Sequence, residues 1–249
     1  MNAQWVRRTI VLASALAAVG MPFAQYAGVL GLTAAEFSEA GSTTLRAAGY
    51  AFAIWGPIYA GLLAYGIYQF IPGLASEPLL KRFAWPSVVA CLCVAAWLVA
   101  AGSDLRWATV GLIALGAFSL IVPLLGVSRT TAKARDAWLV VTPLALLAGW
   151  LTLATGLNTL VVLTLEGFIQ NANANFWALS GLAICVAVAS LVFVRSRAFA
   201  YPLPVIWGLI AVFVAERTGN PLAAWASIAA AIGLAGLTVF IVSRKPKAI

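Results

Sequence analysis

The stretch AAGYAFAIWGPIYAGLLAYGIYQ, residues 47–69, contains six aromatic residues and no charged residue. It is long enough to cross a bilayer, because roughly 20 apolar residues span the hydrocarbon core. A segment that only anchored the chain in lipid would be expected to consist of leucine and valine. This stretch instead places Trp55 and Tyr59 one helical turn apart, on the same face of a helix. It therefore indicates a membrane-spanning helix with an aromatic face.

The rest of the chain has the same apolar character. Of its 249 residues, 63% are hydrophobic and only 9% are charged, whereas charged residues make up about a quarter of a soluble domain. Because a backbone in lipid must satisfy its own hydrogen bonds, each long uncharged run predicts a helix. Such runs occur at about 9–32, 50–71, 85–102, 107–127, 137–158, 175–194, 198–215 and 221–242. The sequence thus predicts an all-α, polytopic bundle of about eight transmembrane helices.

The basic residues predict how this bundle is oriented. If both termini are cytoplasmic, twelve of the 15 basic residues fall on cytoplasmic segments, as the positive-inside rule requires. These twelve are Arg7, Arg8, Lys81, Arg82, Arg129, Lys133, Arg135, Arg195, Arg197, Arg244, Lys245 and Lys247. The other three, Arg46, Arg106 and Arg217, fall on outer segments. We therefore expect a multi-pass protein, of bacterial inner-membrane type, with both termini in the cytoplasm.

The same distribution explains the net charge of +8 without a nucleic-acid partner. The expected partners are membrane lipids and a hydrophobic small molecule, and a homodimer is an open possibility. The chain has no histidine, and its three cysteines, Cys91, Cys93 and Cys185, lie in apolar spans. The usual general base and the commonest metal ligand are therefore missing. No catalytic residue, metal site or cofactor is predicted.

Aromatic residues from several predicted helices fall at one depth, in the outer half of the membrane. On the fifth helix, Trp150, Ala154 and Leu157 share one stripe with Asn158, at spacings i, i+4, i+7 and i+8. A pocket lined by aromatic rings and a few polar groups suits a flat, mostly apolar ligand. The candidate ligand-binding residues, beneath the loop 33–49, are Trp55, Tyr59, Trp97, Trp107, Trp150, Ala154, Leu157 and Asn158. The alternative is that these rings only pack the core of the bundle.

Three motifs in order carry a resemblance to a known family. They are FAIWGPIY in the second helix, Trp107-Ala108 at the start of the fourth, and W-x3-A-x2-L-N from Trp150 to Asn158. With these motifs the chain resembles the tryptophan-rich sensory protein family, also called the translocator protein family, over about 1–160. The chain has Ala47-Ala48 where the family has a proline pair, Val94 where it has asparagine, and Gly111 where it has an acid. The expected domains are a five-helix core, 1–160, and three additional transmembrane helices with a basic cytoplasmic tail, 161–249.

The resemblance implies a function. Members of this family bind tetrapyrroles such as protoporphyrin, and sterol-like lipids, in an aromatic pocket under the first loop. By this resemblance the chain is a sensor or carrier in which the indoles wall the ligand and Asn158 hydrogen-bonds to it. A secondary transporter is one alternative, although such proteins usually keep a charged residue within the bilayer. Here every charged residue maps to a loop or a span end. An intramembrane enzyme acting on porphyrin is the other alternative, but the acids Asp104, Glu166 and Glu216 are isolated in sequence.

Overall fold

A computed structural model describes the chain except for residues 1–2, 30, 42–43, 75–76, 128–133 and 245–249. The described part is helical and contains no strand. Its elements are α1 (Ala3–Tyr26), α2 (Ala34–Ala40), the 3₁₀ helix η1 (Gly49–Ile54), α3 (Trp55–Tyr68), α4 (Pro78–Gly102), α5 (Arg106–Leu124), α6 (Ala134–Asp136), the π-helix η3 (Ala137–Val141), α7 (Thr142–Leu165), α8 (Ala174–Ser196), α9 (Pro202–Glu216) and α10 (Pro221–Ser243). Four of the basic residues used for the orientation, Arg129, Lys133, Lys245 and Lys247, lie outside the described residues.

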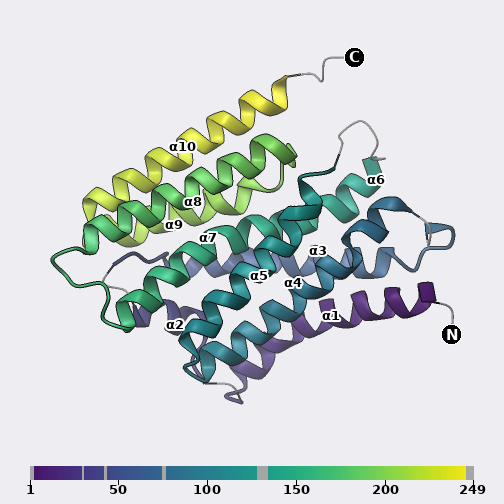
Figure 1. Cartoon of the computed structure of the whole chain (residues 1–249), viewed down its shortest axis with the longest axis horizontal. Coiled ribbons are helices and arrows are strands. Elements are labelled where there is room, and N and C mark those ends of the chain that lie inside the picture. The colour runs from purple at the N-terminus through teal and green to yellow at the C-terminus, as the bar shows by residue number, and fades with distance from the viewer. Residues whose placement is uncertain (1–2, 30, 42–43, 75–76, 128–133, 245–249) are drawn as a thin grey trace.

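The predicted helical membrane bundle is confirmed. In the described part, seven helical segments are long and apolar enough to cross a membrane, and α9 is a shorter apolar helix of 15 residues. Figure 1 shows the start of α1 and the end of α10 at the same end of the bundle, with α2 at the other end. Counted with α9, the described part has eight apolar helical segments, and an even number of crossings brings both ends of the chain to the same side. The chain thus has the architecture of an integral, multi-pass membrane protein.

Several predicted boundaries were wrong; the third span, for example, begins at Pro78 rather than at 85. The first span ends at Tyr26 rather than near residue 32, because the chain turns at Gly28, whose φ of 75° favours glycine. The fifth span continues to Leu165, seven residues beyond the predicted end. There the hydroxyls of Thr159 and Thr164 donate to carbonyls one turn earlier, so polar residues that looked like a helix end stay within the helix.

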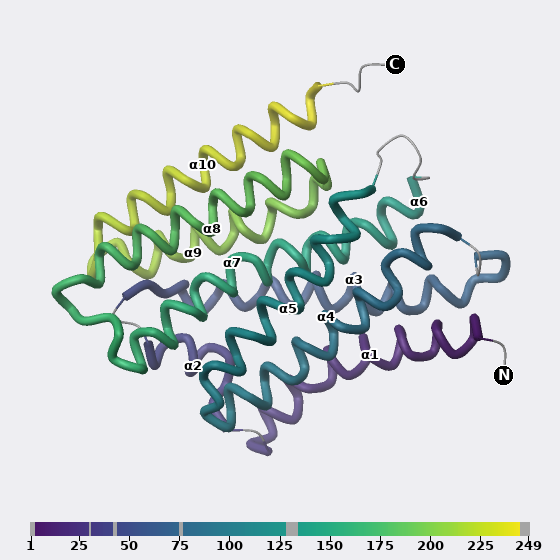
Figure 2. The backbone as a smooth tube through the Cα atoms, viewed as in Figure 1, coloured from purple at the N-terminus to yellow at the C-terminus, as the bar shows by residue number. Residues whose placement is uncertain are grey.

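α7 lies at the centre of the bundle. In the most apolar stretch of the span Ala134–Leu165, to which α7 belongs, 67% of the residues are buried, against 17% in α10. It contacts α3, α5, α8 and α9, and α4 packs between α1 and α5. The tube view in Figure 2 shows α8, α9 and α10 as a group along one side of the bundle, with α10 outermost. Residues of this group and of the first five spans share one hydrophobic cluster.

α9 docks closely on the central helix and on η1. A Cβ on Gly149 would stand only 2.0 Å from the backbone carbonyl oxygen of Tyr201. Only glycine therefore permits this close approach. Nearby, the hydroxyls of Tyr201 and Thr152 are 2.8 Å apart. At the other end of the contact, Trp207 Nε1 donates to the carbonyl of Ala51 at 3.0 Å. The C-terminal helices therefore hold the segment that leads into α3.

Two arginines at the end of the bundle that contains α2 form ion pairs. Arg106 bridges Asp104 at 2.8 Å and Glu166 at 3.3 Å, and its hydrogen bond lowers the pKa of the Asp104 carboxyl. Arg46 approaches Glu216 to 4.0 Å, and its backbone N–H donates to the same carboxylate at 3.1 Å. The three acids that look isolated in sequence thus each face an arginine. They form structural contacts rather than a paired-carboxylate site.

Candidate functional site

A cavity of about 610 Å³ lies in the half of the bundle that contains α2. Its walls come from α1, α3, α4, α5 and α7, and α2 with its preceding residue Thr33 covers it. The volume is within the range of about 300–1,000 Å³ typical of small-molecule sites. The cavity brings together seven of the eight candidate residues: Trp55, Tyr59, Trp97, Trp150, Ala154, Leu157 and Asn158.

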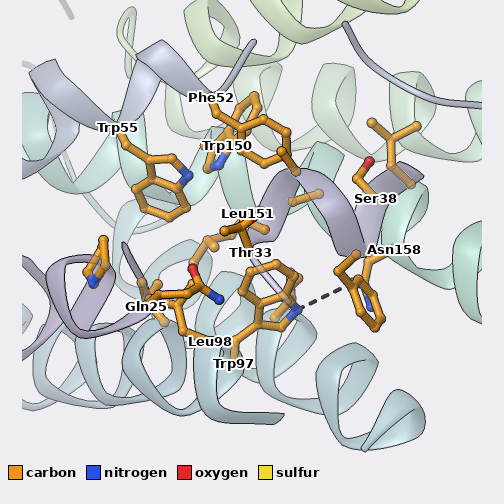
Figure 3. A pocket seen from close by; sticks show the side chains of 18 of the residues that line it. Gln25, Thr33, Ser38, Phe52, Trp55, Trp97, Leu98, Trp150, Leu151 and Asn158 are labelled. Atoms are coloured by element: carbon orange, nitrogen blue, oxygen red, sulfur yellow. Dashed lines mark hydrogen bonds between the residues drawn. The ribbon is translucent and has the colours of Figure 1, made fainter. Parts of the chain in front are cut away.

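Three indoles from three different helices surround this cavity, as Figure 3 shows. Trp55 stacks on Tyr59, with ring centroids 5.0 Å apart and planes at 22°. The edge of one ring meets the face of the other between Trp55 and Trp150, at 6.2 Å and 82°. The spacing W-x3-Y thus produces a stacked pair, and the pair is fixed against α7. Aromatic contacts of this kind are worth about 0.5–1.5 kcal/mol each, so the walls are ordered before any ligand arrives.

The amide of Asn158 holds the third indole. Trp97 Nε1 donates to Asn158 Oδ1 at 3.3 Å, drawn as the dashed line in Figure 3. Asn158 Nδ2 donates in turn to the hydroxyl of Thr109 at 2.8 Å. The family resemblance implies that Asn158 hydrogen-bonds to the ligand. In the structure both polar atoms of the amide already have a partner in the protein, so Asn158 also positions Trp97.

The roof of the cavity is helical, although the sequence suggested only a polar loop. Thr33 and Glu36 form a reciprocal capping box at the start of α2. The backbone N–H of Thr33 donates to the Glu36 carboxylate at 2.7 Å and lowers its pKa. Phe37 is buried beneath the helix, with its ring centroid 6.0 Å from that of Trp97. α2 is therefore packed onto the bundle by an aromatic contact.

The segment after α2 is also fixed to α7. A Cβ on Gly41 would meet the Cα of Val161 at 2.7 Å, so the backbones touch at this glycine. The hydroxyls of Thr44 and Thr164 are 2.6 Å apart. Together with the Arg46–Glu216 contact, these contacts attach described residues between α2 and η1 to the rest of the bundle. The roof is therefore attached to both α7 and α9.

Trp107 is the candidate residue that the structure does not bring to the cavity. Its side chain is 52% exposed at the start of α5, and it is not part of the lining. On α5 the buried face contains Thr109, Ile113 and Gly116 instead. Residues two apart on a helix point in different directions, so Trp107 and Thr109 cannot both face the core.

None of the described residues that line the cavity is charged. Its polar groups are hydroxyls, amides, the Cys93 thiol and indole N–H groups, and the described part of the chain contains no cluster of three potential metal ligands. The cavity is open beside the end of α1, where the lining residues Phe23 and Tyr26 are 71% and 83% exposed. The arrangement is suited to holding an apolar molecule by shape and dispersion.

A comparison with protein families gives the same assignment as the motifs. The model of the family described as TSPO-like protein matches residues 7–240. The chain belongs to the TSPO-like protein family. The match confirms the resemblance seen in the sequence, and it includes α8, α9 and α10, which the motifs left outside. No curated protein and no solved structure matches the chain.

In this TSPO-like protein, part of the cavity lining was not predicted from the sequence. Phe37 and Thr33 come from the roof, and Phe52 from η1 meets Trp150 edge to face at 6.3 Å. Phe52 lies three residues before Trp55, so helical spacing already placed it near the same face. For Phe37 no such signal exists, because α2 is short and its position depends on contacts made far along the chain.

Proposed function

We propose that the protein binds a flat, hydrophobic molecule in this cavity, a tetrapyrrole or a sterol-like lipid, and acts as a sensor or carrier rather than as an enzyme. The observation that carries the proposal is the meeting of Trp55, Trp97 and Trp150 around one cavity of about 610 Å³. Flat faces of indole rings give a planar ring system a large contact area with little loss of conformational entropy. Membership in the TSPO-like family supports the same ligand class.

The uncharged lining limits how a tetrapyrrole would sit. Burying an ionised carboxylate without a partner costs several kcal/mol, on the order of the whole binding energy of a weak ligand. The propionates of protoporphyrin would therefore stay at the opening beside Phe23 and Tyr26, with the ring inside. A neutral ring system has no such restriction. The opening lies at the last turn of the membrane helix α1, which favours entry of the ligand at the membrane surface with its carboxylates toward water.

This proposal is tested by titrating the purified chain in nanodiscs with protoporphyrin and with its dimethyl ester. Quenching of tryptophan fluorescence is expected to saturate at one ligand per chain. The ester is expected to bind at least as tightly as the diacid, because it has no charge to keep in water. Quenching that rises linearly with ligand, at the rate given by partition into the lipid, would contradict the proposal.

A further inference from the structure

A buried arginine lies at the other end of the bundle, the end predicted to be cytoplasmic. Arg8 of α1 is only 6% exposed. Its Nε has no hydrogen-bond partner, and no carboxylate among the described residues forms an ion pair with it. Its guanidinium lies 5.8 Å from the centre of the Trp5 ring. An unpaired Nε on a buried arginine is costly, so this residue indicates a missing partner.

A second unsatisfied side chain lies at the same level of the bundle. Gln69, directly after α3, is fully buried, and neither its amide oxygen nor its amide nitrogen has a hydrogen-bond partner. An amide buried in this state costs about 1–3 kcal/mol for each unpaired group. Asp136 Oδ2 is also buried without a partner at this end, and such a group of atoms is unusual, since buried polar groups are nearly always paired.

Two contacts between α1 and the end of α3 place Arg8 beside Gln69. The centroids of the Trp5 and Phe70 rings are 5.8 Å apart. The side chain of Leu12 lies against Gly66, where a Cβ added to the glycine would be 2.9 Å from the leucine Cδ1. Arg8 is three residues after Trp5 and four before Leu12, so it lies between these contacts on the same side of α1. Gln69 lies between Gly66 and Phe70 on the facing segment.

We propose that Arg8 and Gln69 bind the phosphate headgroup of an anionic phospholipid with free hydroxyls, such as phosphatidylglycerol. A guanidinium presents a planar set of N–H donors that fits phosphate oxygens. The Gln69 amide supplies one further donor, and its oxygen needs a donor that a headgroup hydroxyl provides and a choline does not. Trp5, which is 53% exposed, and Phe70 provide apolar surface beside the site, as expected at the headgroup level.

The geometry favours a lipid over a soluble anion because of where the site lies. Arg8 is the sixth residue of the membrane helix α1, which begins at Ala3, and it lies beside aromatic rings that favour the interface. A phospholipid holds its phosphate at this depth, and its acyl chains extend along the apolar surfaces of the helices. The site lies at the opposite end from the cavity, so it can fail or succeed independently of the proposed function.

The test uses the purified full chain in detergent, with phosphatidylglycerol, phosphatidylcholine or inorganic phosphate added. Thermal unfolding and native mass spectrometry report stabilisation and retained lipid. Phosphatidylglycerol is expected to raise the melting temperature and to stay bound, and the other two are not. Arg8→Gln is expected to lower the affinity for phosphatidylglycerol roughly tenfold or more, the weight of a charge-assisted hydrogen bond. The control Lys81→Gln removes an exposed charge from the same end and is expected to leave the preference intact.

Several results would overturn this proposal. They are no preference for phosphatidylglycerol over phosphatidylcholine in the unaltered chain, an unchanged preference in Arg8→Gln, and full stabilisation by inorganic phosphate alone. If Arg8→Gln does not fold, Gln69→Leu decides the question, because leucine suits a fully buried position. We expect that variant to fold and to bind phosphatidylglycerol severalfold more weakly. Unchanged binding in Gln69→Leu would also contradict the proposal.

Discussion

Replacing Trp150 by alanine is expected to weaken binding of protoporphyrin by about 30-fold or more, the cost of losing a central aromatic contact. Trp150 is 5% exposed, lines the cavity, and has edge-to-face contacts with Trp55 and Phe52. Its loss removes one side of the cavity, and the rings of Trp55 and Phe52 each lose a packing partner. Ligand titration by fluorescence, with thermal unfolding of the same sample, measures the effect separately from any loss of stability.

Trp55→Ala and Trp107→Ala complete this experiment. Trp55 is less buried than Trp150, so its removal is expected to weaken binding with a smaller loss of stability. Trp107 is the matched control, because it is an indole at the same end of the bundle but outside the cavity. Its replacement is expected to change the affinity less than about twofold, within the range of a surface substitution. Equal losses in Trp107→Ala and Trp150→Ala would show that the cavity is not the binding site.

Gly149→Ala is expected to destabilise the protein by about 3 kcal/mol, at the upper end for overpacking a core. The added methyl group would stand 2.0 Å from the Tyr201 carbonyl oxygen, which belongs to backbone and cannot rotate away. α9 must therefore move, and the contact between the Tyr201 and Thr152 hydroxyls is lost with it. Because Gly208 of α9 lies against Trp150, ligand affinity is expected to fall as well. Unfolding in mixed detergent micelles measures the change in stability.

Gly233→Ala is the control for this second prediction. Gly233 is also in a membrane helix, α10, but a Cβ there would have nothing within 4 Å. Alanine is the better helix former, so this variant is expected to be unchanged or more stable by up to about 1 kcal/mol. A Gly149→Ala protein as stable as Gly233→Ala would show that α9 does not pack on α7 as described.

The parts of the site that depend on helical spacing could be predicted from sequence. On α7 a polar Asn158 and a buried Trp150 on one stripe can face only the interior, because a lipid-facing asparagine would be unsatisfied. The same spacing predicts the Trp55–Tyr59 pair. In both cases the information is local, within two turns of one helix, and the structure places these residues around one cavity.

Trp107 shows where that reasoning is insufficient. A family motif and its depth in the membrane make this residue a candidate, but depth does not determine the direction in which a side chain points. The small and polar residues Thr109 and Gly116, both buried on α5, indicated the inner face of that helix instead. In membranes small residues mark helix contacts, so they are a better guide than a single tryptophan at a helix start.

The roof and the docking of α9 could not be predicted, because they depend on contacts between distant residues. Gly41 meets Val161, and Gly149 meets the Tyr201 carbonyl. In the sequence each is one glycine among 21, with nothing to show which backbone approaches it. The same holds for the buried state of Arg8, which the sequence places simply among the basic residues of a cytoplasmic end.

The central claim is that a planar hydrophobic ligand occupies the cavity lined by Trp55, Trp97 and Trp150. Photolabelling of the full chain in nanodiscs with a diazirine-bearing sterol analogue, mapped by mass spectrometry, tests it most directly. Labels are expected on cavity residues of α1, α3, α4 and α7, and excess protoporphyrin is expected to suppress them. Labels spread over exposed residues such as Trp107 and Phe118, and unaffected by protoporphyrin, would contradict the claim.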